Sequence, residues 1–202
     1  MLYLDMKIGI IGAGDIGGTL GMRWRQKGHE IMFGVRNRKS QNVQKLIELG
    51  KNLKFGEIRE TVVFGDVIVF AVPWTSVEET ILIAGNLTDK ILIDPTNPLT
   101  PDLKGLALET TSAAEKMSNL ANSTKVVKAF NMIGAKTLSN LIYDSQRADV
   151  FICGDDSYAK QIVREFAIDI GFDVIDVAPL VNARLLESLA LLWIELALRQ
   201  QM

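Results

Sequence analysis

The chain has 202 residues, of which 48% are hydrophobic and 23% charged, and its formal net charge is −2. This length and hydrophobic content suit one or one and a half globular domains with a sizeable core. The small negative charge argues against a nucleic-acid-binding protein. No stretch reaches the roughly 18 apolar residues of a membrane span. The single cysteine, Cys153, excludes an internal disulfide framework and fits a reducing compartment. We therefore expect a cytoplasmic protein that binds neither nucleic acid nor a membrane.

The chain opens on a strand, a glycine loop and a helix. Lys7–Ile11 is an apolar, β-branched run that is typical of a buried parallel strand, and Gly12-Ala13-Gly14-Asp15-Ile16-Gly17 follows it directly. Ile16, Leu20 and Trp24 then recur at helical spacing. In such a loop Gly12 permits a tight turn, Gly14 lets the backbone approach a pyrophosphate, and Gly17 lets the helix pack close to the strand. The loop therefore predicts a dinucleotide phosphate site at the helix N-terminus.

The segment after the second strand indicates which dinucleotide is bound. The strand Glu30–Gly34 is followed by Val35-Arg36-Asn37-Arg38-Lys39-Ser40, where an NAD enzyme usually has an acidic residue for the ribose 2′-hydroxyl. A 2′-phosphate instead requires positive charge and forked donors, which arginine supplies. We interpret Arg36 as its principal partner, supported by Asn37, Arg38 and Ser40. The alternative is an ordinary solvated basic loop.

Strands and helices alternate through the rest of the chain. In chain order we expect a helix over Val43–Leu49, a strand over Asp66–Val72, a helix from Pro73 to about Ala84, strands over Lys90–Asp94, Lys125–Phe130 and Asp149–Cys153, a helix over residues 157–170, a strand over Phe172–Val177 and a helix over Ala183–Arg199. This rhythm predicts an α/β fold with a Rossmann-type, doubly wound parallel sheet. We divide it into an NADP-binding domain (residues 1–148) and a small C-terminal α/β extension (residues 149–202) that ends in the long helix.

The last helix has an unusually wide apolar face. Leu185, Leu189, Leu192 and Leu196 form one stripe, and Leu186, Ala190, Trp193 and Ala197 form another. A single face toward a core accounts for one stripe only. The second stripe predicts either a homodimer formed through this helix or the wall of a pocket.

The ends of the later strands supply candidate ligand contacts. Pro73, Asn97 and Asn131 each follow a strand, where ligands bind in such sheets, although each segment could also be only a turn. The sole histidine, His29, precedes the second strand and is interpreted as structural. Cys153 lies in an apolar run and is interpreted as a core thiol, and Lys128 lies within a strand. No metal-ligating pattern and no acid–base residue of the usual dehydrogenase type is evident, so we expect hydride transfer by proximity, without a catalytic residue.

Several of these segments together resemble the NADPH-dependent reductases of the 8-hydroxy-5-deazaflavin coenzyme F-420, to which the cytoplasmic domains of six-transmembrane ferric reductases are related. The motifs that carry the resemblance are Gly12–Gly17, Gly34-Val35-Arg36-Asn37, Ala71-Val72-Pro73-Trp74, Asp94-Pro95-Thr96-Asn97-Pro98, Ala129-Phe130-Asn131, Cys153-Gly154-Asp155-Asp156 and Val181-Asn182-Ala183-Arg184-Leu185-Leu186-Glu187. The resemblance covers nearly the whole chain. It implies hydride transfer from NADPH to a flat ring stacked on the nicotinamide.

The resemblance also assigns roles to individual positions. It implies that Asp15, Ile16, Asn37, Ala71, Val72, Pro73 and Asn97 join the glycines and Arg36 in binding NADP(H). It implies that Asn131, Met132, Ile133, Gly134 and Leu186 flank the acceptor, a deazaflavin (coenzyme F-420) or a flavin co-substrate. Two other functions stay open: an NADP-binding sensor or accessory subunit without turnover, and a reductase of a small carbonyl or imine substrate.

Overall fold

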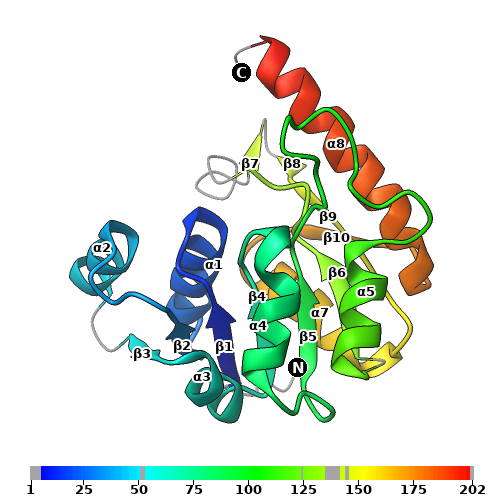
Figure 1. Cartoon of the computed structure of the whole chain (residues 1–202). Coiled ribbons are helices and arrows are strands. Elements are labelled where there is room, and N and C mark those ends of the chain that lie inside the picture. The colour runs from blue at the N-terminus through cyan, green and yellow to red at the C-terminus, as the bar shows by residue number, and fades with distance from the viewer. Residues whose placement is uncertain (1–5, 51–52, 124, 135–141, 144–145, 201–202) are drawn as a thin grey trace.

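The computed structural model describes residues 6–50, 53–123, 125–134, 142–143 and 146–200 of the chain. Within these residues, eight strands form one sheet with helices on both faces, and two further strands form a separate hairpin (Figure 1). The strands of the sheet are β1 (Lys7–Ile11), β2 (Glu30–Gly34), β3 (Lys54–Gly56), β4 (Val67–Phe70), β5 (Ile91–Asp94), β6 (Val126–Ala129), β9 (Asp149–Gly154) and β10 (Asp173–Asp176), and the hairpin is β7 (Ile142–Tyr143) with β8 (Gln146–Arg147). The helices are α1 (Asp15–Gln26), α2 (Gln41–Leu49), α3 (Ile58–Phe64), α4 (Val77–Ala84), α5 (Ala113–Ala121), α7 (Ser157–Asp169) and α8 (Ala183–Gln200), with 3-10 turns η1 (Trp74–Ser76) and η2 (Leu180–Asn182).

The sheet has the strand order of a dinucleotide-binding fold. Its strands run β10-β9-β6-β5-β4-β1-β2-β3, so the first six strands in the chain have the order that places a ligand crevice between β1 and β4. β1 lies at this centre and pairs in parallel with β2 on one side and β4 on the other. The central strands β4, β5 and β6 are buried throughout, as expected for parallel strands that are covered by helices on both faces. The predicted α/β Rossmann-type fold is confirmed.

Two apolar cores flank the sheet. One lies under α1 and α7, where Trp24 and Phe166 pack close together, and the indole Nε1 of Trp24 donates to the Phe166 carbonyl at 2.9 Å. The other lies under α3, α4, α5 and the start of α8, and includes Met117 and Leu186. Since the first turns of α8 pack into this second core, the C-terminal helix is part of the same body as the glycine loop (Figure 1).

Two strands, β9 and β10, run opposite to the expected direction. β9 pairs antiparallel with β6, and Lys128 lies opposite Cys153. A parallel pairing requires a crossover connection to the far end of the sheet, usually a helix. The β7–β8 hairpin precedes β9, which therefore starts at the edge where β6 ends. The predicted doubly wound parallel sheet therefore contains one antiparallel pairing, between β6 and β9, and β10 pairs in parallel with β9.

β9 and β10 belong to the main sheet. The division of the chain into two domains at residue 148 stays a prediction. The elements that were not predicted are β3, α3, α5, the β7–β8 hairpin and the 3-10 turns η1 and η2. The helix after Pro73 begins only at Val77, because Trp74–Ser76 forms a 3-10 turn first.

In the part of the chain that the structure describes, no helix has the length and apolar character needed to cross a membrane.

Candidate active site

The glycine loop joins β1 to α1 in a tightly constrained turn. Gly12 has a φ of +105°, and a Cβ there would lie 2.1 Å from the Ala71 carbonyl oxygen. A Cβ on Gly17 would lie 2.7 Å from the Gly12 carbonyl oxygen and 2.8 Å from the Ala71 Cβ. Both glycines are therefore required for the loop and α1 to pack against the end of β4. Ala71 serves here as the surface against which the loop closes.

Gly14 has a different role in the same loop. A Cβ on Gly14 would meet nothing within 4 Å, so the space beside its backbone is open. α1 begins at Asp15, and no side chain in the described part of the chain caps its N-terminus. The first-turn N–H groups of a helix lack partners within the helix and attract anions. Open space beside uncapped N–H groups fits a bound pyrophosphate.

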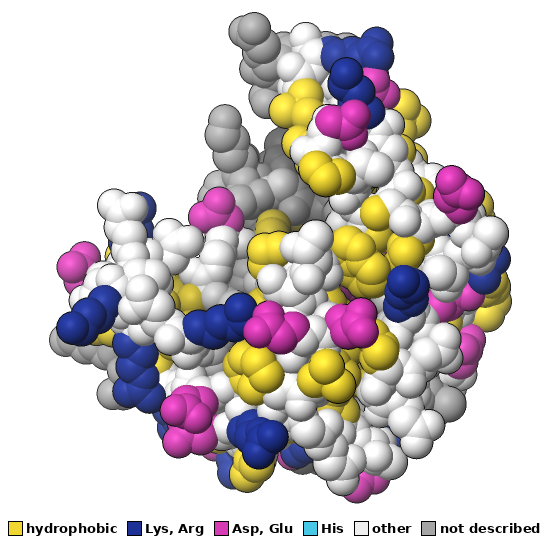
Figure 2. All heavy atoms as spheres, viewed as in Figure 1, with side chains coloured by type: hydrophobic (Ala, Val, Ile, Leu, Met, Phe, Trp, Pro, Cys, Tyr) yellow, Lys and Arg dark blue, Asp and Glu magenta, His cyan; other side chains and the backbone are white. Residues whose placement is uncertain are grey.

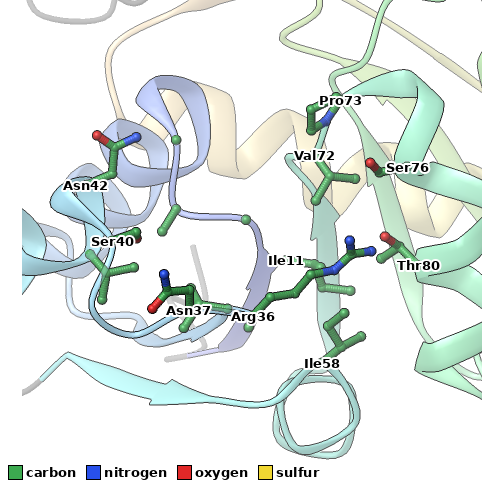
Figure 3. Close-up of a pocket in the computed structure, with 16 residues that line it drawn as sticks. Ile11, Arg36, Asn37, Ser40, Asn42, Ile58, Val72, Pro73, Ser76 and Thr80 are labelled. Atoms are coloured by element: carbon green, nitrogen blue, oxygen red, sulfur yellow. The ribbon is translucent and has the colours of Figure 1, made fainter.

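A pocket of about 270 Å³ lies between this loop, the end of β2 and the start of α4 (Figure 3). The predicted residues that line it are Gly12, Gly14, Arg36, Asn37, Ser40, Val72 and Pro73. Figure 3 shows the Arg36 side chain extending across the pocket toward Thr80. The pocket thus places the expected cation beside the expected phosphate loop.

The Arg36 guanidinium forms an ion pair with an acidic residue of α4, Glu79. Its Nη2 donates to Glu79 Oε2 of α4 at 2.7 Å, and both side chains are more than half exposed. Arg38 is not in the pocket lining; its Nη2 donates to the Phe55 carbonyl at 2.6 Å. Asp15, Ile16 and Ala71 also lie outside this lining, although they belong to the same loop and strand end.

Thr80 was not singled out from the sequence. It is buried and lines the pocket, yet its Oγ1 has no hydrogen-bond partner among the described residues. A buried hydroxyl without a partner costs free energy, and a polar group of a ligand can satisfy it. The open loop, the cation and this hydroxyl together fit a dinucleotide.

The ends of β5 and β6 meet through two asparagines. Asn97 Nδ2 donates to the Asn131 carbonyl at 2.7 Å, and Asn131 Nδ2 donates to Asn97 Oδ1 at 3.0 Å. Asn131 Nδ2 also donates to the Leu186 carbonyl of α8 at 3.1 Å. Phe130, which precedes Asn131, has a φ of +64°, an uncommon conformation for a residue with a side chain. The structure therefore brings Asn97, Asn131 and Leu186 together as one bridge between two strand ends and α8.

A second cavity of about 320 Å³ lies beside this bridge, where β6 ends and β9 begins. Its walls are mostly apolar and aromatic, and are formed by Phe130–Ile133, Ala148–Phe151, Phe172 and Trp193. Met132 and Ile133 thus line a cavity, as predicted for an acceptor site. Gly134 is exposed next to them, and the Leu186 side chain is buried in the core.

Lys128 is the centre of a buried ionic cluster that sequence reasoning did not find. Its Nζ donates to Asp94 Oδ2 at 3.0 Å, to Glu187 Oε1 at 2.6 Å and to the Thr96 carbonyl at 2.5 Å. The three charged side chains are at most 1% exposed. Burial alone would lower the pKa of Lys128, but the carboxylates of Asp94 and Glu187 outweigh this effect and raise it. Burial raises the pKa of Glu187, and Lys128 opposes that shift only in part.

His29 and Cys153 line neither the pocket around Arg36 nor the cavity beside Asn131. His29 is buried at the opposite ends of the strands, where its Nδ1 accepts from the Met6 N–H at 3.3 Å and its ring packs on Phe166. Cys153 is fully buried, and this burial raises the pKa of its thiol to about 12. A thiol with so high a pKa is a poor nucleophile.

The sheet order, the glycine loop and Arg36 are those of a Rossmann-type dinucleotide-binding protein whose pocket fits NADP(H). Residues 7–98 match a family model described as "NADP oxidoreductase coenzyme F420-dependent". The matched residues are a little under half of the chain, and relatives that align over nearly its full length are described as NADP reductases of the same kind.

Two curated relatives are similar to the chain over most of its length. It is 29% identical to the F420-dependent NADP reductase of Methanothermobacter thermautotrophicus over 97% of this chain and 91% of the relative. It is 35% identical to the metalloreductase STEAP3 of Rattus norvegicus over 92% of this chain. That alignment covers 36% of STEAP3, so the chain spans about a third of the length of the metalloreductase that it matches.

Solved structures give the same picture. A structure described as an F420-dependent NADP-reductase from an Arthrobacter species superposes with a TM-score of 0.88 at 26% identity, over 98% of this chain and 96% of that one. A reductive aminase from Aspergillus terreus has a TM-score of 0.68 at 19% identity, over 98% of this chain and 64% of that one. The second likeness shows the fold alone.

Proposed function

We propose that this protein transfers a hydride between NADP(H) and a flat ring acceptor, a deazaflavin of the coenzyme F-420 type or a flavin. The observation that carries this proposal is the aromatic cavity beside Asn131, at the same edge of the sheet as the glycine loop and Arg36. A hydride acceptor must stack on the nicotinamide, and apolar and aromatic walls suit a flat ring.

The ionisable groups near this cavity support the same acceptor class. Among the described residues, Asp149 is the only ionisable one in the cavity lining, and it is exposed. Lys128 is fully buried, and its hydrogens are taken by three acceptors. The described residues therefore offer orientation and an apolar surface, with no buried acid or base poised over the ring. A deazaflavin or flavin ring needs no such group, because the carbon or nitrogen that accepts the hydride belongs to a ring system that exchanges its own proton with water.

The test is NADPH oxidation by the purified protein, followed through the nicotinamide absorbance. The deazaflavin, FMN and FAD are supplied in parallel, with NADH as the control donor. Turnover with the deazaflavin or a flavin supports the proposal. Tight NADPH binding without turnover on these acceptors favours the sensor or accessory-subunit alternative. Turnover only with cyclic imines or small ketones favours a reductase of such substrates.

Trp193 provides a specific test of the acceptor cavity. Replacing it with alanine should raise the KM for the acceptor roughly two- to tenfold, the effect of losing one aromatic packing partner. The KM for NADPH should not change. Leu198→Ala is the matched control, since Leu198 is also exposed on α8 but does not line the cavity. Equal effects of the two variants would place the acceptor elsewhere.

We also propose that two copies of the chain associate through α8. Along this helix Leu185, Leu189, Leu192 and Leu196 are 67%, 41%, 53% and 39% exposed, and Figure 2 shows apolar side chains gathered in this region of the surface. Their spacing of four, three and four residues is that of a helix–helix seam. The same stripe on a second copy is its natural complement in a twofold-symmetric pair.

Light scattering coupled to size exclusion measures this association. The protein should elute with the mass of a dimer, and Leu189→Glu combined with Leu192→Glu should give a folded monomer. Leu82→Glu is the control, because Leu82 is 71% exposed on α4, outside the stripe. A wild-type protein that is monomeric at micromolar concentration would contradict the proposal.

A further inference from the structure

We propose that Lys128, Asp94 and Glu187 form a positioning cluster that fixes the Asn97–Asn131 bridge and thereby sets the geometry between nicotinamide and acceptor. This inference rests on the proposed function, because it concerns the edge where the two rings would meet. None of the three side chains reaches either cavity, so they act through the residues that they hold.

The first link runs from Lys128 to Asn97. An ammonium group has three hydrogens, and Lys128 uses one of them on the carbonyl of Thr96, the residue before Asn97. Asp94 Oδ1 in turn accepts from the Thr96 N–H at 2.8 Å and from the Thr96 hydroxyl at 2.7 Å. The backbone just before Asn97 is therefore fixed on both sides of Thr96, by Asp94 at its N–H and by Lys128 at its carbonyl.

The second link runs from Lys128 to Asn131 and α8. Glu187 follows Leu186, whose carbonyl accepts from the Asn131 amide. The Glu187 carboxylate accepts from Lys128 and also from the backbone N–H of Ala113, at the start of α5, at 3.0 Å. α8 is thus held at the very turn that orients Asn131. The ammonium group of Lys128 in β6 thus contacts both the segment after β5 that carries Asn97 and the start of α8 that orients Asn131.

Energetics argue that this cluster serves geometry more than stability. Burying an ion pair costs several kcal/mol of solvation, and well-packed apolar residues in its place are often equally stable. Charged hydrogen bonds, however, are directional, and a satisfied buried network specifies one arrangement of its members. Phe130, held at a positive φ between Lys128 and Asn131, is a strained residue of the kind that persists only where its surroundings determine it.

The test compares the wild type with a triple variant, Asp94→Asn, Lys128→Met and Glu187→Gln, which keeps the side-chain volumes and removes every charge together. The variant should fold, and its Kd for NADPH should change far less than its kcat, because the pocket around Arg36 and Gly14 shares no residue with the cluster. Its kcat should fall about 10- to 100-fold, the cost of misplacing reacting groups by roughly 1 Å. The kinetic isotope effect with deuterated NADPH should rise, since hydride transfer then limits the rate.

The control is Val163→Ala, a buried residue of α7 under the opposite face of the sheet. It lowers the melting temperature without touching the edge and should leave kcat unchanged below that temperature. If both variants lose kcat in proportion to their melting temperatures, the cluster serves stability alone and the proposal is wrong.

A second measurement separates this inference from the proposed function. Hydrogen exchange of the NADPH-bound protein should show faster exchange at residues 94–98 and 130–134 in the triple variant, with residues 10–18 unchanged. This readout needs no acceptor, so it tests the cluster even if no acceptor supports turnover. Unchanged exchange at both segments, or a kcat within twofold of the wild type, would overturn the inference.

Discussion

Replacing Arg36 with alanine is expected to weaken NADPH binding about 10- to 150-fold while NADH binding barely changes. The basis is the loss of a charged hydrogen bond to the 2′-phosphate, worth about 1.5–3 kcal/mol. Arg36 lines the pocket beside the glycine loop, and NADH has no phosphate for it to contact. Isothermal titration with both dinucleotides measures the difference. An equal loss for both would mean that Arg36 supports the structure of the pocket and does not select the cofactor.

Glu79→Gln is the companion to this experiment. Glu79 Oε2 lies 2.7 Å from Arg36 Nη2 and competes with a 2′-phosphate for this guanidinium. The glutamine removes both the competing partner and a negative charge near the phosphate. Because the pair is more than half exposed, we expect a modest gain in NADPH affinity of about two- to fivefold. In the Arg36→Ala background the same change should have a smaller effect.

Alanine at Gly12 and at Gly14 should fail in two different ways. Gly12→Ala places a Cβ 2.1 Å from the Ala71 carbonyl and forces an L-residue to a φ of +105°, so we expect a loss of stability of several kcal/mol or no folded protein. Gly14→Ala meets no atom within 4 Å and should fold with nearly the wild-type melting temperature. Its methyl group would nevertheless occupy the space through which a pyrophosphate approaches the backbone, so NADPH binding should fall at least tenfold.

Thermal unfolding and NADPH titration of the two variants together locate the phosphate site. Gly17→Ala serves as a further packing control, since its Cβ would also clash with backbone, 2.7 Å from the Gly12 carbonyl. If Gly14→Ala bound NADPH as tightly as the wild type, the loop would be a structural turn without a phosphate.

The residues of the adenosine half of the site could be predicted because they are local in sequence. Gly12 to Gly17 and Arg36 lie within 25 residues, next to strands whose buried runs are unambiguous. The short helix α5 was missed, although Ser112 and Glu115 form a capping box that marks its start. The Ser112 hydroxyl accepts from the Glu115 N–H at 3.1 Å, and a search for Ser-x-x-Glu would have found it.

The far half of the site could not be predicted in the same way. Lys128 meets Asp94 across 34 residues and Glu187 across 59, and periodicity carries no information about such pairs. The direction of β9 likewise depends on where its connection leaves the sheet, and residue type says nothing about this. Asn97 and Asn131 were each expected to contact a ligand, whereas the structure shows that they also hold each other.

The contact between Glu187 and Lys128 affects the order in which parts of the structure form while the chain is synthesised on the ribosome. The described residues that line the pocket around Arg36 lie before residue 81, so the ribosome has made this pocket's wall before it makes Asp94, Lys128 or Glu187. The bridge of Asn97 and Asn131 needs Leu186 and Glu187, which emerge more than 50 residues after Lys128. A nascent chain should therefore complete the edge where a second ring would meet the nicotinamide only when its last helix docks.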